Sequence, residues 1–502
     1  MNNIINRLKQ FSFFDTFKHI STYFSGAILV HLLGVVTLPV FTNYLTTEEY
    51  GIVNVFITYL TTIGVLMTFN LHSSVSRYYF EKESNDFDTF LGTMFITVSV
   101  VFFFLGTLLF IFREPIAEYL NIRSHLIKWL LLTAYLIVVY NFFAQIQIAT
   151  KQSKQYITLQ VAWQYGKFAL TLIGLIYLTG VIYTPTNEPH SYTFMGKIIG
   201  ECIGTGLIAA YAFKQIYRYM SFKKLSFSYV KYALIYSIPL VPFTLSNQIL
   251  TFFDQWYINS TIGNAEVGQY AFAYKIGMIY LGLVIALING ARPSYYEYMD
   301  QKKYKEVWQQ IDSMTKLLVL GGGFLILFAV DAGTLLSSSD VFLEALPIAP
   351  VIVGGYVFYG ISLFANRGIY YKKKNIYLAV IVLTSGIANI FLNSYFIPRY
   401  GYEVAAYTTL ASYFMMMVLS ILFTTYILKL PPLPLGRILK YIVLLGLIIA
   451  LNYTVGEPNL GLDFKWIVFK AILFGVLGLA LFYDKLGIIL AKEPMDSDIL
   501  DQ

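Results

Sequence analysis

Long apolar segments constrain this chain more than any other feature. They recur along its whole length and measure about 20 residues each, which is the length of α-helix that crosses a bilayer. Charged residues make up only 13% of the 502 residues, whereas soluble domains usually carry about 25%. The mean hydropathy of +0.63 agrees with this pattern. The sequence therefore predicts an all-α polytopic membrane protein.

The apolar segments divide into about fourteen expected transmembrane spans, joined by short loops with no room for a folded soluble domain. We place them at 18–44, 52–76, 89–112, 126–149, 157–182, 193–217, 232–260, 267–291, 307–330, 341–366, 375–397, 402–428, 437–456 and 464–483. An even number of spans puts both termini on the same side of the membrane.

The basic residues indicate which side that is. The loops on one side hold only Arg113, Arg123, Arg399 and Lys465, whereas the termini and the other loops hold most of the remaining Lys and Arg residues. Because cytoplasmic loops are enriched in Lys and Arg, we expect cytoplasmic N- and C-termini. The net charge of +7 is then a consequence of topology and does not indicate nucleic-acid binding.

Two halves of the chain begin alike. Glu49-Tyr50-Gly51 aligns with Glu266-Val267-Gly268, and the same separation aligns Tyr78-Tyr79 with Tyr295-Tyr296. Internal repeats with a site between them are typical of transporters. We therefore expect a six-helix N-lobe (1–217), a cytoplasmic inter-lobe loop (218–231), a six-helix C-lobe (232–428), two extra helices (429–492) and a cytoplasmic tail (493–502).

Ionisable residues inside the spans are candidate site residues, because a charge near the bilayer centre costs at least ~2.5–3.5 kcal/mol. Cations outnumber anions among them, which favours a cationic cavity for an anionic substrate. The candidate substrate-binding residues are Lys275, Lys167, Lys197, Lys316 and Arg292. Two alternatives stay open: Lys197 and Glu201 lie four residues apart and could neutralise each other, and Arg292 lies near a helix end, where basic side chains snorkel.

Three residues are candidates for coupling transport to an ion, either H⁺ or Na⁺. They are Asp254 near the outer end of the seventh span, Glu201 in the sixth, and His31 in the middle of the first. A histidine titrates near neutral pH, although an interior histidine can equally serve as a hydrogen-bonded structural residue.

Prolines within the opening spans of both lobes are candidate hinges. Pro39 lies in the first span, and Pro239 and Pro242 lie in the seventh. Each removes a backbone hydrogen bond, which would let the helix bend during alternating access; the alternative is a static kink, since membrane helices tolerate proline.

Signs of enzymatic chemistry are lacking in the sequence. It holds no phosphate-binding loop, no His/Glu metal spacing and no Gly-x-Ser-x-Gly elbow. The single cysteine, Cys202, excludes an intramolecular disulfide. We therefore expect a transporter without cofactor or metal, driven by an ion gradient, the membrane potential or the substrate gradient.

Local motifs in both halves resemble a known family. Thr42-Asn43-Tyr44-Leu45 with Glu48-Glu49-Tyr50-Gly51, and Phe253-Asp254-Gln255-Trp256 with Glu266-Val267-Gly268-Gln269-Tyr270, are similar to the start motifs of Wzx-like polysaccharide flippases. These belong to the multidrug/oligosaccharidyl-lipid/polysaccharide exporter superfamily. The resemblance implies a V-shaped pair of six-helix bundles in the bacterial cytoplasmic membrane, with Lys275 at the family's cationic position in the eighth helix.

The resemblance also implies a function. An undecaprenyl-pyrophosphate-linked oligosaccharide would be flipped to the periplasmic leaflet for O-antigen or capsule synthesis, together with a polysaccharide polymerase and a chain-length regulator. Thr58 stands opposite Lys275 in the repeat, which argues against lipid II as the substrate. Two alternatives remain: a multidrug cation antiporter of the same superfamily, and a non-transporting scaffold of a polysaccharide synthase complex.

Overall fold

The computed structural model describes residues 33–81, 86–150, 152–181, 193–222, 225–430, 433–455 and 462–490. Within these residues, every regular element is a helix. The expected all-α class is therefore confirmed. His31 and the tail from residue 493 lie outside the described residues.

The helices follow the predicted spans closely. The first half contains the helix Leu33–Tyr44, α3 (Thr47–Thr68), η1 (Leu71–Ser73), α4 (Ser74–Glu81), α5 (Phe87–Ile111), α6 (Arg113–Tyr119), α7 (Leu126–Ala149), α8 (Ser153–Val181) and α9 (Phe194–Tyr217). The second half contains α10 (Phe227–Ser237), α11 (Leu240–Thr261), α12 (Asn264–Asp300), α13 (Tyr304–Leu336), η3 (Asp340–Ile348), α14 (Ala349–Tyr371), α15 (Asn375–Tyr400), α16 (Val404–Leu422), η4 (Phe423–Ile427), α17 (Leu435–Val455) and α18 (Phe464–Leu490).

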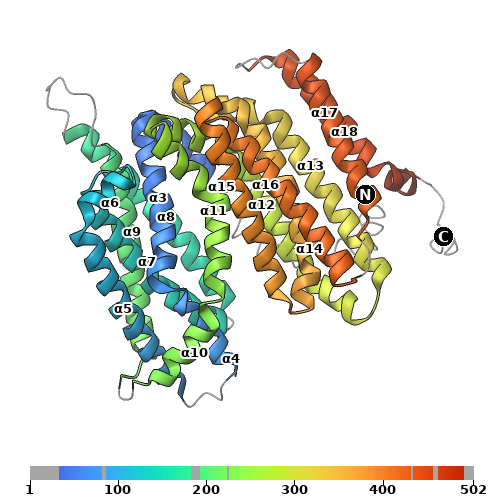
Figure 1. Ribbon diagram of the computed structural model, residues 1–502. Helices are drawn as coiled ribbons and strands as arrows, with labels where there is room; N and C mark the ends of the chain where they lie inside the picture. Colours follow the sequence, from blue (N-terminus) through green and yellow to red (C-terminus); the bar gives the residue numbers. More distant parts are fainter. Residues whose placement is uncertain are drawn as a thin grey trace.

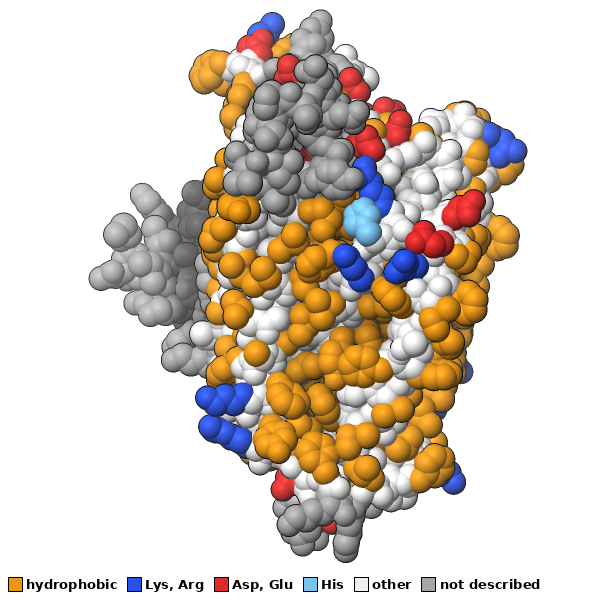
Figure 2. Space-filling model, turned by 90° about the vertical axis from the view of Figure 1, so that its left-hand side faces the viewer, with side chains coloured by type: hydrophobic (Ala, Val, Ile, Leu, Met, Phe, Trp, Pro, Cys, Tyr) orange, Lys and Arg blue, Asp and Glu red, His pale blue; other side chains and the backbone are white. Residues whose placement is uncertain are grey.

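In the described part, eleven helices are long and apolar enough to cross a membrane, and the bent pair α10–α11 gives a twelfth. This is compatible with the expected fourteen spans. The first expected span is described only from residue 33, and α8 coincides with the fifth. On the face shown in Figure 2, hydrophobic side chains cover the middle and charged side chains lie towards the two ends, as a membrane-embedded surface requires.

The helices form two bundles that stand side by side in Figure 1. Helices α3 to α9 make the first bundle and α11 to α16 the second, while α17 and α18 pack on the far side of α13. Two ion pairs fix this last pair of helices: Arg437 Nη1 lies 3.2 Å from Asp312 Oδ2, and Lys470 Nζ lies 2.6 Å from Asp331 Oδ2. The two largely buried carboxylates, Asp312 and Asp331, are tolerated here because each has a basic partner.

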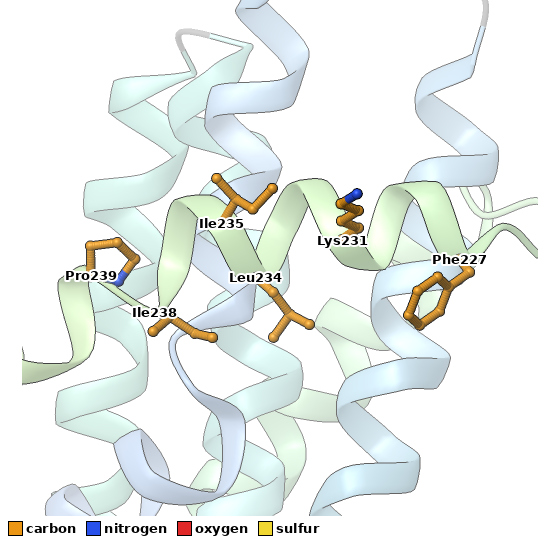
Figure 3. A pocket seen from close by; sticks show the side chains of 6 residues that line it. All are labelled: Phe227, Lys231, Leu234, Ile235, Ile238 and Pro239. Carbon is orange, nitrogen blue, oxygen red and sulfur yellow. The ribbon is translucent and has the colours of Figure 1, made fainter.

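The seventh span is broken at its first proline. Helices α10 and α11 meet at an angle of 45°, and α10 runs across its neighbours in Figure 3. Stacked aromatic rings hold α10 against the first bundle: Tyr229 lies edge-on to Tyr78 and Phe90, which stack 3.8 Å apart. The bend lies at Pro239; whether Pro239 serves as a hinge or as a static kink stays a prediction.

A shallow pocket lies on the outer face of this bend (Figure 3). It is lined by Phe227, Lys231, Leu234, Ile235, Ile238 and Pro239. All of these residues come from one continuous segment, and the lining is apolar apart from the lysine. A long basic side chain over an apolar helix face is typical of the membrane interface, so this pocket is not our candidate site.

The two bundles touch where α3 and α12 begin, which we call the outer end. Here the two equivalent glycines of the repeat, Gly51 and Gly268, lie against the partner helix. A Cβ added to Gly51 would lie 1.7 Å from the carbonyl oxygen of Asn264, and one added to Gly268 would lie 1.9 Å from that of Thr47. Only glycine allows backbones to approach this closely.

Polar contacts reinforce this closure of the outer end. Asn121 Nδ2 donates to the carbonyl of Asn259 at 2.7 Å, and Asn259 Nδ2 donates back to the carbonyls of Leu120 and Asn121 at 3.1 Å. The backbone N–H of Ser338 donates to Thr42 Oγ1 at 2.9 Å. Each of these contacts joins one bundle to the other.

Glu49 organises the outer end of the first bundle. Its carboxylate accepts the backbone N–H of Thr46 at 3.2 Å, and the Thr46 hydroxyl accepts the N–H of Glu49, which completes a capping box at the start of α3. Glu49 Oε1 also accepts the N–H groups of Thr193 and Phe194, where α9 begins. One carboxylate thus satisfies the first N–H groups of two helices.

We expect Glu49→Ala to lower the free energy of unfolding by about 2–4 kcal/mol, because it removes a cap and leaves buried N–H donors without an acceptor. The measurement is thermal unfolding of the detergent-purified protein, followed by tryptophan fluorescence. Glu48→Ala is the matched control, because Glu48 is exposed in the same helical turn. Equal unfolding temperatures for the two variants would contradict this role of Glu49.

Candidate functional site

Four charged side chains from both bundles gather between the lobes; we call them the inter-lobe charge cluster. They are Lys167 on α8, Lys197 and Glu201 on α9, and Lys275 on α12. Lys167 Nζ lies 2.6 Å from Glu201 Oε1. The charge of Lys275 interacts with those of Glu201 and Lys167, and the charge of Lys197 interacts with all three. The structure thus brings together four of the residues selected from the sequence.

Close packing of α8 against α9 builds the first-bundle half of this cluster. Gly196, Gly200 and Gly204 repeat every four residues on α9. A Cβ at Gly200 would lie 2.5 Å from the backbone of Thr171, and one at Gly204 would lie 2.8 Å from Lys167 Cγ. Small residues at this spacing let membrane helices approach closely. The four-residue spacing of these glycines is visible in the sequence, where it is the signal for close packing of this helix.

The sequence left open whether Lys197 and Glu201 neutralise each other, and the Lys167–Glu201 pair bears on this alternative. Glu201 makes its close ion pair across to α8, whereas Lys197 lies over aromatic rings, with Nζ 3.8 Å from the ring centre of Phe41. Lys167 also lies 4.6 Å from the ring centre of Trp163. Aromatic faces attract basic groups, and both lysine side chains lie against such faces.

The inter-lobe charge cluster contains more basic than acidic side chains. It contains three lysines and one carboxylate, and all four side chains are partly buried. The side chains of Lys167 and Glu201 are 13% and 17% exposed. Charges held at low solvent exposure attract an opposite charge more strongly than they would in water. The arrangement is suited to binding an anion between the two bundles.

Asp254 lies in a second and separate polar cluster within the second bundle. Its side chain is 1% exposed. Its carboxylate accepts hydrogen bonds from Tyr270, Thr409 and Asn393, each at 2.6 Å. Asn393 in turn bonds to Asn389 and accepts from Thr408. Among the described residues, no ion pair includes Asp254. The described donors to this carboxyl group are all neutral, so a proton or a small cation could bind there.

The structure does not bring Lys316 to the inter-lobe charge cluster. Lys316 Nζ lies 3.7 Å from Asp312 Oδ2 on the same helix, and it faces the rings of Tyr441 on α17 and Phe482 on α18. Its described contacts therefore belong to the packing of the two last helices. The excess of cations in the sequence did not reveal that Asp312, nearer the helix end, partners this lysine.

Arg292 is exposed near the inner end of α12 and donates to Asn289. Nearby Arg367, which the sequence did not single out, is 2% exposed, and its Nη2 donates to the Ile288 carbonyl at 2.8 Å. Its Nε and Nη1 atoms have no hydrogen-bond partner within the described part of the chain. A basic residue near a helix end usually snorkels, which is why the sequence gave no signal for it.

The candidate hinges lie at the starts of the lobes. Pro39 lies in the helix Leu33–Tyr44, and Pro239 and Pro242 flank the start of α11. His31, the third candidate for ion coupling, lies outside the described residues.

Comparison with known proteins places this geometry in context. Residues 17–292 match the protein family described as "Polysaccharide biosynthesis protein". A curated relative, Lsg locus putative protein 1 of Haemophilus influenzae, is 21% identical over 298 residues, which cover 57% of this chain and 67% of the relative.

Solved structures share the fold. The lipid II flippase MurJ in an inward closed conformation is similar with a TM-score of 0.72 at 17% identity, over 93% of this chain and 100% of that chain. A multidrug resistance MATE family transporter in an inward-facing conformation has a TM-score of 0.61 at 12% identity, over 81% of this chain and 94% of that chain. The expected arrangement of two bundles with additional C-terminal helices is confirmed.

Proposed function

We propose, from the premise that this chain belongs to the polysaccharide biosynthesis protein family, that it is a flippase for lipid-linked oligosaccharides. The substrate is an undecaprenyl-pyrophosphate-linked repeat unit for O-antigen or capsule. It moves from the cytoplasmic to the periplasmic leaflet of the bacterial inner membrane, and both termini of the protein are cytoplasmic. The glycan passes between the lobes while the lipid tail stays in the bilayer.

The observation that carries this proposal is the inter-lobe charge cluster. A pyrophosphate is a compact anion, and three lysines around one glutamate attract such a group. Lys275 comes from the second bundle and Lys167 and Lys197 from the first. An anion bound between them would therefore link the two bundles and bias their relative position, as alternating access requires. Arg292, near the inner end, would attract the head group on entry.

A single observation weighs against the antiporter alternative. A carrier of hydrophobic cations would be expected to present carboxylates between its lobes, whereas the inter-lobe charge cluster has more cations than anions. A transport cycle would require the outer-end contact between Gly51 and Gly268 to break and re-form, whereas a scaffold would not.

Ion coupling would use Asp254. Its carboxylate is buried in the second bundle away from the cationic cluster, so binding of an ion there and of the substrate between the lobes need not compete. Glu201, which pairs with Lys167, is the alternative. A polysaccharide polymerase and a chain-length regulator would receive the flipped product.

The test is polymer export in a flippase-deleted bacterial host that carries the glycan gene cluster belonging to this protein. We expect the wild type to restore export and Lys275→Ala to reduce it at least about tenfold, because an ionic contact to a charged group contributes about 1.5–3 kcal/mol. Lys303→Ala is the matched control, because Lys303 is an exposed lysine between α12 and α13. Membrane levels are compared by blotting.

Full export by a Lys275→Ala variant that inserts normally would contradict the proposed role of the inter-lobe charge cluster in binding the substrate. If the wild type does not restore polymer export in a host with its own glycan gene cluster, the flippase proposal itself is contradicted. Inhibition of export by hydrophobic cations would favour the antiporter.

A further inference from the structure

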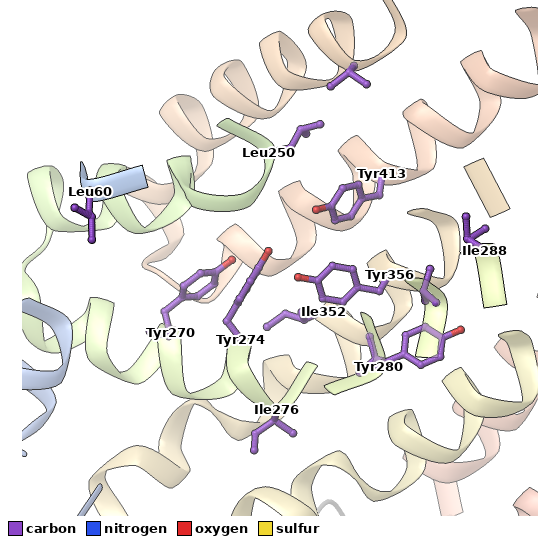
Figure 4. Close-up of a cluster of buried hydrophobic side chains, with 14 of the residues drawn as sticks. Leu60, Leu250, Tyr270, Tyr274, Ile276, Tyr280, Ile288, Ile352, Tyr356 and Tyr413 are labelled. Carbon is purple, nitrogen blue, oxygen red and sulfur yellow. The ribbon is translucent and has the colours of Figure 1, made fainter. Parts of the chain in front are cut away.

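One group of buried aromatic side chains packs within a single bundle. Figure 4 shows it in the core of the second bundle, where Tyr270 and Tyr274 of α12 lie beside Tyr356 of α14 and Tyr413 of α16. A second group is different, because it contains rings from both bundles. We call it the outer aromatic group, and each of its members is at most 7% exposed: Phe41, Tyr50, Phe272 and Phe342.

The outer aromatic group joins the two bundles ring to ring. Tyr50 of α3 lies edge-on to Phe342 of η3, with ring centres 5.7 Å apart and ring planes at 83°. On one side of this pair, Phe41 lies 6.3 Å from Tyr50, and on the other, Phe272 of α12 lies 5.4 Å from Phe342. Edge-on and offset rings at such separations attract each other. The four buried rings therefore form a continuous apolar contact from one bundle to the other.

Phe342 belongs to a segment that is fastened to the second bundle. Gln269 Nε2 of α12 donates to the Val341 carbonyl at 3.1 Å. Towards the first bundle, Ser338 Oγ at the start of this segment donates to the Pro39 carbonyl at 3.0 Å. When the outer end opens, the segment stays with α12, and the contacts that Phe342 and Ser338 make with the first bundle must break.

Lys197 connects the outer aromatic group to the inter-lobe charge cluster. It lies one turn inside the outer start of α9, and its Nζ is 3.8 Å from the ring centre of Phe41 and 5.8 Å from that of Tyr50. It also interacts with the charges of the other three members of the cluster. Among the described contacts, no other member of the cluster lies over a ring of the outer aromatic group.

We propose that Lys197 couples anion binding at the inter-lobe charge cluster to opening of the outer aromatic group, with Phe342 as the ring that separates from the first bundle. This deepens the proposed function, because it describes the regulation of the same anion site, and it rests on that proposal. Without an anion, the Lys197 side chain lies on Phe41 and Tyr50, and the outer end stays closed. A bound pyrophosphate draws Lys197 away from the rings.

The exchange follows from the strength of the two contacts. A phosphate group attracts a basic side chain more strongly than an aromatic face does. Without an anion, the neighbouring basic side chains of Lys167 and Lys275 disfavour a position of Lys197 closer to them. Once Lys197 leaves the rings, Tyr50 loses a contact and its edge-on contact with Phe342 weakens. The anion then binds the open state more tightly than the closed state, which is what shifts the equilibrium.

The coupling is measured on the purified full-length protein, in which Cys202 is replaced by alanine and Thr42→Cys reports on the outer end, where Thr42 is 3% exposed. A membrane-impermeant maleimide labels the reporter at increasing concentrations of inorganic pyrophosphate. We expect saturating pyrophosphate to speed labelling at least about fivefold, since coupling between two sites changes an equilibrium by about 5- to 150-fold. A labelling rate that does not respond to pyrophosphate would overturn the proposal.

Lys197→Met separates coupling from binding. Methionine keeps an unbranched side chain that packs on aromatic rings, but it has no basic group. We expect the acceleration by pyrophosphate to disappear, although Lys167 and Lys275 still bind pyrophosphate and raise the unfolding temperature in its presence. Lys167→Met is the matched comparison and should need more pyrophosphate to reach the wild-type acceleration. Full acceleration in Lys197→Met, or the same loss in both variants, would contradict the role of Lys197.

Phe342→Ala tests the ring that closes the outer end. Without this ring, we expect fast labelling of the reporter even in the absence of pyrophosphate, and little further effect of pyrophosphate. Phe342→Leu retains an apolar side chain, should unfold close to the wild-type temperature, and should be labelled at an intermediate rate. Phe391→Ala is the matched control, because Phe391 of α15 is 70% exposed. Slow labelling of both Phe342 variants would overturn the role of this ring.

These measurements use pyrophosphate and no glycan, so they are independent of the export assay. If pyrophosphate opens the outer end through Lys197 and the wild type still does not restore export, this inference stands and the flippase proposal is contradicted. If the wild type restores export and Lys197→Met keeps the full response to pyrophosphate, only this inference is contradicted.

Discussion

Replacing either Gly51 or Gly268 with alanine is expected to disfavour closure of the outer end and to reduce transport. Each added Cβ would lie less than 2 Å from a carbonyl oxygen of the other lobe, at 1.7 Å and 1.9 Å respectively. Both atoms involved are backbone, so no side chain can rotate away, and the lobes must separate. Overpacking of this kind costs about 1–3 kcal/mol, which changes the ratio of closed to open molecules by about 5- to 150-fold.

This expectation is measured by cysteine accessibility. Cys202, the native cysteine, is first replaced, and Thr42→Cys is introduced as the reporter, because Thr42 is 3% exposed where it contacts the other lobe. A membrane-impermeant maleimide should label the reporter much faster in the Gly51→Ala and Gly268→Ala backgrounds. The double variant should label no faster than either single variant, because both substitutions break one contact.

Gly64→Ala provides the matched control in the same helix as Gly51, because nothing lies within 4 Å of a Cβ at that position. In the Gly64→Ala background the Thr42→Cys reporter should be labelled slowly, and the variant should export polymer normally. Slow labelling together with normal export in the Gly268→Ala variant would mean that the outer end does not need this contact.

Removing Glu201 is expected to destabilise the protein more than removing its partner Lys167. Without Glu201, the three lysines of the inter-lobe charge cluster repel one another. Without Lys167, Glu201 still interacts with Lys197 and Lys275. Breaking a buried pair costs about 3–5 kcal/mol; because these side chains keep 13% and 17% exposure, we expect about 2–4 kcal/mol for Glu201→Gln.

Thermal unfolding of Glu201→Gln, Lys167→Met and the double variant measures this difference. The double variant should be more stable than Glu201→Gln, because it also removes one of the repelling cations. Added pyrophosphate should raise the unfolding temperature of Glu201→Gln more than that of the wild type, because ligand binding stabilises the folded state. Equal destabilisation by the two single variants, with no effect of pyrophosphate, would contradict an anion site.

The polar residues were only partly predictable from the sequence. Mid-span ionisable residues are costly in lipid, so Lys167, Lys197, Glu201 and Lys275 stood out, and the structure gathers them. Lys316 stood out for the same reason, yet its partner is Asp312 on the same helix, next to Arg437. Uncharged residues around Asp254 gave no signal, because Asn, Thr and Tyr are common in membrane helices and acquire a role only through their neighbours.

The sequence by itself determined the all-α membrane class, the approximate spans, the repeat and the position of a candidate hinge at Pro239. Each of these depends on local properties: hydrophobic length, charge distribution and the missing N–H of proline. Only the tertiary structure decided that Gly51 meets the other lobe beside Gly268, that Glu201 pairs with Lys167, and that Tyr270, Asn393 and Thr409 donate to Asp254. These are contacts between residues far apart in the chain, and they are fixed by how closely the helices pack.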